Sequence, residues 1–120
     1  MAVDQFAERL AKIRTRFAAN LPGKIESVER ALPLLAGEGD AVGALLATAH
    51  RSVHELCGIA PTVGFPATGR AARTVERILL QPLRAKRGLT DAELASARQE
   101  LEGLRSAFQN DQQTSTGQAE

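Results

Sequence analysis

The sequence contains no Trp or Tyr, and aromatic residues make up only 3% of the chain. Strands of a β-sheet favour aromatic and β-branched residues, so their scarcity, together with frequent Ala, favours closely packed helices. The formal net charge of +1 shows no basic surplus, and no stacking aromatics alternate with basic residues. Nucleic-acid-binding domains usually carry such features. We therefore expect no nucleic-acid partner.

Cysteine occurs once, which excludes an internal disulfide and fits a reducing cytosol. No stretch approaches the roughly 18 consecutive apolar residues of a membrane span, and the first residues lack the apolar run of a signal peptide. We therefore expect a cytoplasmic protein without a membrane partner. The glycines also lack the GxxxxGK[ST] or GxGxxG spacing that cradles a nucleotide, so we expect no ATP-dependent kinase activity of its own.

The length of 120 residues is typical of a single domain. Within it, apolar residues recur at helical spacing in five stretches. The first predicted helix covers about 4–19 and has a narrow apolar stripe of Val3, Phe6, Leu10, Ile13 and Phe17. Because Pro lacks a donor and disfavours a helical residue before it, we expect Pro22 to end this helix. Four further helices are predicted at about 22–36, 41–60, 66–80 and 90–109.

These stretches predict an all-α fold, an antiparallel up-down four-helix bundle with an additional N-terminal helix. Asp40 is the predicted N-cap of the helix at 41–60, and Thr90 with Glu93 forms a capping box. Residues 1–110 would form the bundle domain. The sequence after Asn110 offers no apolar anchor, so we predict a disordered C-terminal tail at 111–120.

The stretch from Ala49 to Phe65 carries the candidate site, because it places His54 and Gly58 one turn apart on the same helical face. Gly inside a helix costs about 0.5–1 kcal/mol relative to Ala, so its presence suggests a use. A bare backbone beside the imidazole would let a second protein approach closely. The opposite side is predicted to face the core, through Leu45, Ala49, Val53, Leu56 and Ala60.

The pattern HxLxGxAxxxGF, which begins at His54 and ends at Gly64 and Phe65, resembles the signature of histidine-containing phosphotransfer (HPt) domains. These helical bundles are phosphocarriers in the multistep phosphorelays of two-component systems. The resemblance implies that His54 is the phosphoacceptor. It implies as partners the receiver domains of response regulators and of a hybrid histidine kinase. Mg²⁺ would be supplied by the receiver, so the chain needs no cofactor of its own. Since no extra apolar stripe demands a dimer, we take the chain as a monomer.

Several neighbours of His54 could shape the phosphate environment. Many HPt domains carry Lys three residues after the histidine, and here that position is Cys57. A positive charge could come instead from Arg51, one turn before His54, or from Arg70 and Arg73 on the following helix. These arginines could equally form a solvated basic face. Two further residues, His50 and Phe65, are candidates for receiver docking.

Two other functions compete with phosphotransfer. His50, His54 and Cys57 stand at i, i+4 and i+7, a spacing that brings three good ligands toward one helical side and could bind Zn²⁺. In the preferred interpretation the chain holds no metal. The other alternative is an interaction module that binds a receiver domain without accepting phosphate.

Overall fold

The computed structural model describes the backbone of residues 2–119 and the side chains of residues 4–114. Within this part of the chain every regular element is helical, so the predicted all-α class is confirmed. The α-helices are α1 (Ala2–Ala31), α2 (Asp40–Thr62), α3 (Pro66–Ala85) and α4 (Asp91–Ala119), and a 3-10 helix, η1, spans Leu32–Ala36. No helix in the described residues is long and apolar enough to cross a membrane.

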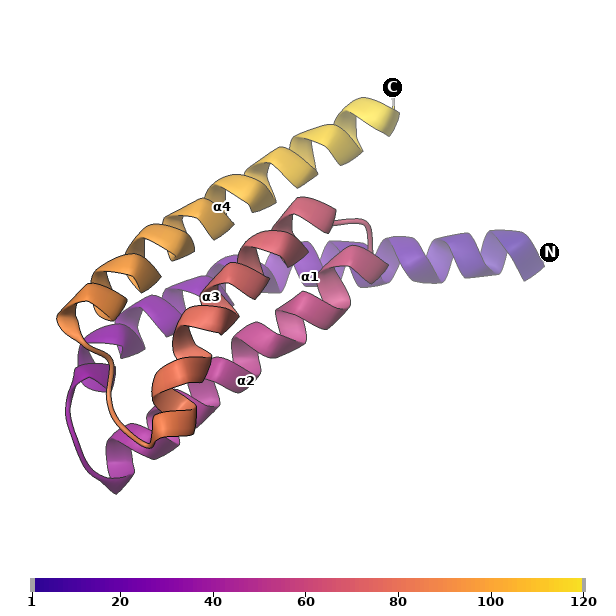
Figure 1. Cartoon of the computed structure of the whole chain (residues 1–120). Helices are drawn as coiled ribbons and strands as arrows, with labels where there is room; N and C mark the ends of the chain where they lie inside the picture. The colour runs from indigo at the N-terminus through magenta and orange to yellow at the C-terminus, as the bar shows by residue number, and fades with distance from the viewer. Residues whose placement is uncertain (1, 120) are drawn as a thin grey trace.

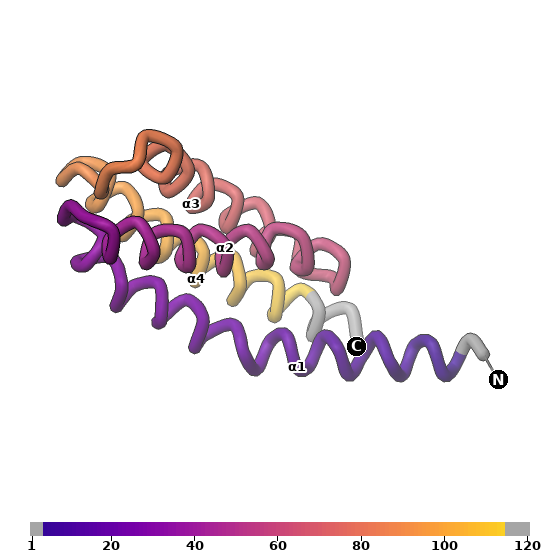
Figure 2. The backbone as a smooth tube through the Cα atoms, turned by 90° about the horizontal axis from the view of Figure 1, so that it is seen from below, coloured from indigo at the N-terminus to yellow at the C-terminus, as the bar shows by residue number. Residues whose placement is uncertain are grey.

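Successive α-helices run in opposite directions along an elongated molecule of 55 × 24 × 19 Å (Figure 1). Helices α2 and α3 form a tight hairpin, with α4 beside α3. The C-terminal half of α1 closes the bundle, whereas its first turns extend beyond the other helices (Figure 2). The bundle therefore leaves one end of its longest helix without a neighbouring helix.

The predicted helix break at Pro22 is wrong, because α1 is continuous from Ala2 to Ala31 with Pro22 inside it. The separate N-terminal helix of the prediction is the first half of α1. An interior Pro costs about 3 kcal/mol in an isolated helix. Here the helical phase carries on into the bundle, where Leu21 and Ile25 are almost completely buried while Pro22 faces solvent. Packing of the residues around Pro22 outweighs its local cost.

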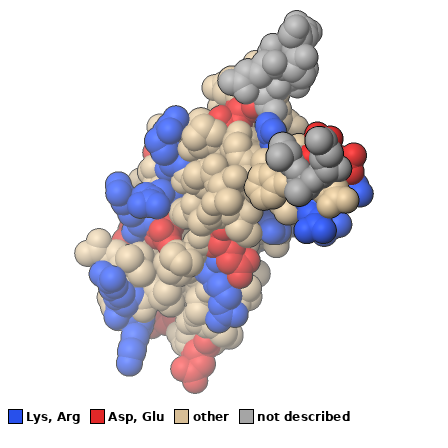
Figure 3. Space-filling view, turned by 90° about the vertical axis from the view of Figure 1, so that its right-hand side faces the viewer, with Lys and Arg blue, Asp and Glu red and all other residues tan. Residues whose placement is uncertain are grey.

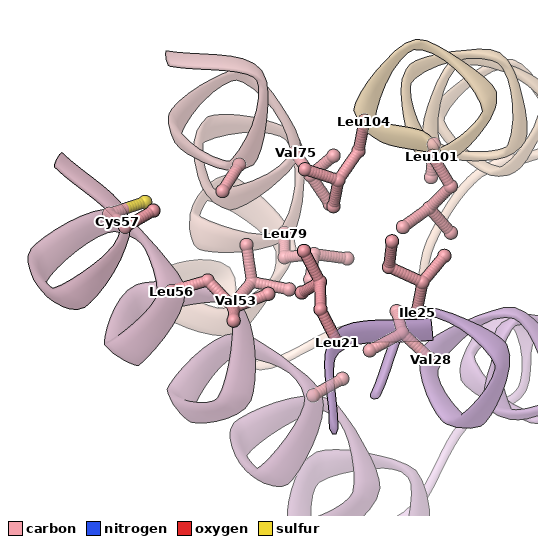
Figure 4. Packing of buried hydrophobic residues seen from close by; sticks show 14 of the residues in the cluster. Leu21, Ile25, Val28, Val53, Leu56, Cys57, Val75, Leu79, Leu101 and Leu104 are labelled. Atoms are coloured by element: carbon pink, nitrogen blue, oxygen red, sulfur yellow. The ribbon is translucent and has the colours of Figure 1, made fainter. Parts of the chain in front are cut away.

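The core lies between all four α-helices (Figure 4), and apart from Cys57 and three Phe residues it is aliphatic. The predicted inward face of α2 is confirmed for Ala49, Val53, Leu56 and Ala60. The prediction that Leu45 faces the core is wrong, because its side chain is 39% exposed and Leu46 is buried instead. From α4, Ala97, Leu101, Leu104 and Phe108 are buried in the core. For the predicted stripe of α1, only Phe17 is fully buried, and the side chain of Val3 lies outside the described residues.

The connection between α2 and α3 brings these helices very close together. Gly64 has a φ of 93°, in the left-handed region that favours glycine, and α2 reaches Thr62 with Pro61 inside it. A Cβ atom on Gly69 of α3 would lie 2.7 Å from Cγ of Pro61, so a larger residue would push the helices apart. This close crossing sets the distance between the side chains that face each other two turns further along α3.

The helix ends agree with the prediction at α4 and differ at α2. The N–H of Glu93 donates to Thr90 Oγ1 at 3.1 Å, and the N–H of Thr90 donates to Glu93 Oε1 at 2.9 Å, which confirms the capping box. Asp40 is the first residue of α2 rather than its N-cap. Gly39 holds the N-cap position with a φ of 110°, a conformation that favours glycine over Asp.

The predicted disorder at 111–120 is wrong where side chains are described, because α4 continues through this segment and Asp111 is buried. The carboxylate of Asp111 accepts hydrogen bonds from the Thr68 N–H at 2.7 Å and the Thr68 Oγ1–H at 2.8 Å. It also accepts one from the N–H of Ala67. Asp111 thus caps the N-terminus of α3 from another helix, so the anchor of this segment is polar. The side chains of 115–120 lie outside the described residues.

Asp111→Ala should lower the free energy of unfolding by about 1–3 kcal/mol, because the buried amide and hydroxyl of Thr68 would lose their acceptor. Urea denaturation followed by circular dichroism would measure the change. Asn110→Ala is the matched control, since Asn110 is exposed on the same helix. Equal stability of the two variants would show that Asp111 does not anchor α4.

Candidate functional site

His54 projects from the middle of α2 on the side that faces α3, and its side chain is 67% exposed. Its Nδ1 atom forms a short hydrogen bond with Oε2 of Glu76, a residue of α3. A carboxylate only accepts hydrogen bonds, so Nδ1 donates its proton to Glu76, and in the neutral imidazole this arrangement leaves the lone pair on Nε2. The ring is therefore oriented by the protein on one side and open on the other.

Glu76 is the functional residue that the sequence analysis missed. It lies on α3 two turns after Gly69, and its side chain is only 17% exposed. A signal did exist, since Glu76 is the only acidic residue between Pro66 and Ala85, a segment rich in Arg. Sequence spacing alone could not show it, because the carboxylate and the imidazole come from different helices.

His50 also faces Glu76, but it is much less accessible than His54. Its Nε2 atom lies 3.7 Å from Glu76 Oε2, and its side chain is 19% exposed. This nitrogen is buried and has no hydrogen-bond partner among the described residues. The two imidazole rings are nearly parallel, with centroids 6.0 Å apart. His50 is therefore packed behind the site, where its Nε2 cannot meet a protein that approaches from solvent.

Cys57 lies at the edge of the core (Figure 4). Its Sγ atom is 3.8 Å from Glu76 Oε1, within reach of a weak S–H hydrogen bond. Burial, and then the negative charge of Glu76, raise the pKa of the thiol to about 11, although Arg73 acts in the opposite direction. The thiol therefore stays protonated and donates to Glu76, whose two oxygens contact Cys57 and His54.

Gly58 is exposed on α2, one turn beyond His54. A Cβ atom built on it would meet no atom within 4 Å. The structure therefore gives no packing reason for glycine at this position. The space beside the imidazole is open, as the predicted access role requires.

The predicted cations lie on the surface around the site. The side chains of Arg51, Arg70 and Arg73 are exposed and form no ion pair with the described residues. The charge of Arg73 lowers the pKa of Cys57, so Arg73 lies close to the contact between Cys57 and Glu76. Figure 3 shows several Lys and Arg side chains along one edge of the face it displays, next to a broad uncharged area. Contact of these arginines with a phosphoryl group stays a prediction.

The predicted docking role of Phe65 is wrong, because its side chain is 4% exposed. Its ring centroid lies 5.2 Å from that of Phe17 and 5.8 Å from that of Phe108. Phe65 therefore joins α1 and α4 to the α2–α3 connection. The residue stabilises the end of the bundle and offers no surface to a partner.

The combination of an exposed, oriented imidazole and an all-α bundle agrees with the comparison with known families. The model of the family described as "Hpt domain" matches residues 12–114. The chain belongs to the Hpt domain family. Hpt domains are phosphocarrier modules of phosphorelays rather than kinases, and they interact with receiver domains. Searches of curated proteins and of solved structures found no match to this Hpt domain.

The metal-binding alternative finds no support in the geometry of this Hpt domain. His54 Nδ1 and the Cys57 thiol are engaged by Glu76. Among the described residues no group of three or more His, Cys, Asp or Glu side chains could hold a metal ion. A helical spacing of i, i+4 and i+7 brings residues to one side of α2 without making their donor atoms converge.

Proposed function

We propose that this Hpt domain accepts a phosphoryl group on Nε2 of His54 from a receiver-domain aspartate and passes it to another receiver domain. The observation that supports this proposal is the hydrogen bond from His54 Nδ1–H to Glu76. It fixes the proton on the inner nitrogen and leaves the outer nitrogen as a nucleophile in solvent. The receiver partners would belong to response regulators and to a hybrid histidine kinase, in the cytoplasm.

In the forward step, the lone pair of His54 Nε2 attacks the phosphorus of the aspartyl phosphate in line with the bond that breaks. The P–O bond to the aspartate breaks, and its electron pair stays with the carboxylate. The ring gains positive charge as the P–N bond forms. The negative charge of Glu76 then stabilises the ring through Nδ1–H. In the return step a second receiver's aspartate attacks the phosphorus, and the P–N electron pair returns to Nε2.

The receiver would supply the groups that neutralise the transferred oxygens, chiefly Mg²⁺ and a basic residue. Arg73 and Arg70 of this chain are candidates for additional contacts with those oxygens, because both are exposed on α3. Cys57 takes no part in the transfer itself. Its protonated thiol instead helps to hold the Glu76 carboxylate under the imidazole.

Incubation with a receiver domain that carries ³²P on its aspartate would test the proposal. We expect ³²P to appear on this chain within minutes. The label should be labile in acid and stable in base, as is typical of a phosphoramidate bond. A second, unphosphorylated receiver should then remove the label. Stable binding of the receiver without any transfer of label would contradict the proposal and favour a docking module.

Gly58 gives a separate prediction on access. Gly58→Ala should raise the free energy of unfolding by about 0.5–1 kcal/mol, because the Cβ atom fits and Ala favours helix. Gly58→Gln should be equally well folded, but its side chain would obstruct docking of the receiver. We therefore expect the second-order rate of transfer to fall about tenfold or more, which corresponds to about 1.4 kcal/mol of activation free energy.

Gly23 provides the matched control for Gly58, because a Cβ atom there also meets nothing within 4 Å and the residue lies on α1. Gly23→Gln should leave transfer unchanged. If Gly58→Gln transferred phosphate as fast as Gly23→Gln, the bare backbone beside His54 would have no role in access.

A further inference from the structure

The N-terminal half of α1 carries large apolar side chains that the bundle does not cover. Phe6 is 69% exposed and Ile13 is 49% exposed, whereas Phe17, on the same stripe, is buried. The first turns of this helix extend past the other helices (Figures 1 and 2). The apolar stripe of α1 therefore begins in solvent and enters the core at Phe17.

The apolar stripe of α1, of which Phe6 and Ile13 are exposed, has the spacing of a coiled-coil seam. Phe6, Leu10, Ile13 and Phe17 alternate at steps of four, three and four residues, which are successive d and a positions of a heptad. The stripe is narrow, because the positions that flank it are occupied by Ala or Arg. A narrow seam fits one partner helix, whereas a helix that lies on a membrane needs a wide apolar face.

The charges beside this seam have one sign. Arg9 and Arg16 occupy consecutive g positions, and both are exposed without an ion pair among the described residues. The acidic residues of this segment, Asp4 and Glu8, lie on the opposite side of the helix. Two copies of α1 packed seam to seam in an antiparallel arrangement would bring g positions with the same charge together. The charges thus disfavour a second copy and favour a partner with acidic flanks.

A groove continues the seam toward the bundle. Leu10 is half-buried, and with Arg14 it lines a groove whose other walls are the end of α2, the start of α3 and the segment of α4 that includes Asp111 and Thr114. A helix laid along α1 would thus contact both the exposed stripe and this groove.

We infer that the N-terminal half of α1 is a docking surface for an amphipathic helix with acidic residues beside its apolar seam, on a partner protein. The surface uses none of the residues that surround His54, so it could tether the Hpt domain while the imidazole serves a receiver. Its role goes beyond phosphotransfer, because it selects a partner by helix pairing and charge.

Titration of the full chain with two labelled 28-residue helical peptides, followed by fluorescence anisotropy, would test this inference. Both peptides carry Leu at the a and d positions, one with Glu and the other with Lys at e and g. The Glu peptide should bind with a micromolar Kd that weakens as salt rises, and the Lys peptide should bind at least tenfold more weakly. The double variant Arg9→Glu and Arg16→Glu should bind the Glu peptide with an affinity about tenfold lower than that of the wild type.

The controls separate this surface from general stickiness. Arg30→Glu changes an exposed charge at the other end of α1, and Leu34→Ser removes an apolar side chain that is 59% exposed on η1. Both should bind the Glu peptide as the wild type does, whereas Phe6→Ser with Ile13→Ser should not bind it. All variants should still accept phosphate on His54.

Three results would overturn the inference. The first is equal affinity for both peptides, or no detectable binding of the Glu peptide at a concentration of about 100 μM. The second is concentration-dependent self-association in sedimentation equilibrium that Phe6→Ser with Ile13→Ser abolishes, which would assign the surface to a second copy. The third is stronger binding to vesicles of phosphatidylserine and phosphatidylcholine than to the Glu peptide.

Discussion

His54→Gln should abolish phosphoryl labelling of this Hpt domain, whereas His50→Gln should leave the final extent of labelling unchanged. An amide nitrogen has no available lone pair, so Gln at 54 cannot attack phosphorus. The Nε2 atom of His50 is buried, whereas the side chain of His54 is 67% exposed. Transfer from a ³²P-labelled receiver to the two variants and the wild type, measured in parallel, checks this expectation.

The stability of the two variants is the control for this result. His54 is 67% exposed, so His54→Gln should change the free energy of unfolding by no more than about 0.5 kcal/mol. Loss of labelling in a folded His54→Gln variant would thus report on chemistry. Loss of labelling in His50→Gln alone, with His54→Gln still labelled, would identify the other imidazole as the acceptor.

Local patterns were sufficient to predict the parts of the fold and site that depend on neighbours in the sequence. The periodicity of α2 placed Val53 and Leu56 in the core, and the one-turn spacing placed His54 and Gly58 on the outer face. The capping box of Thr90 was likewise readable, because both of its partners lie within one turn. Each of these features depends on helix geometry alone.

Contacts between helices account for what the sequence did not reveal. Pro22 signals a break, but burial of Leu21 and Ile25 against the bundle keeps α1 continuous. Asp111 looks like part of a polar tail until α4 brings it to the first-turn amides of α3, which have no partner within their own helix. Phe65 follows a turn and so resembles a surface residue, yet the tight α2–α3 connection directs its ring between Phe17 and Phe108.

Glu76→Ala should slow phosphoryl transfer to His54 about 10–100-fold while leaving His54 the only labelled residue. A hydrogen bond to a charged group contributes about 1.5–3 kcal/mol, which corresponds to that range of rates when the bond strengthens in the transition state. Without the carboxylate, the proton would no longer be held on Nδ1 and the ring could rotate. Rapid-quench measurement of transfer from a labelled receiver would give the rate.

Glu76→Gln separates the two contributions of Glu76. The Gln oxygen can still accept the Nδ1–H bond and orient the ring, but it cannot stabilise the positive charge that develops as the P–N bond forms. We therefore expect a rate between those of the wild type and Glu76→Ala. Glu55→Ala is the matched control, because it removes an exposed carboxylate next to His54 in the sequence and should transfer normally. If Glu76→Gln equals the wild type, orientation alone explains the role of Glu76, and if Glu76→Ala does too, this carboxylate has no role in the transfer.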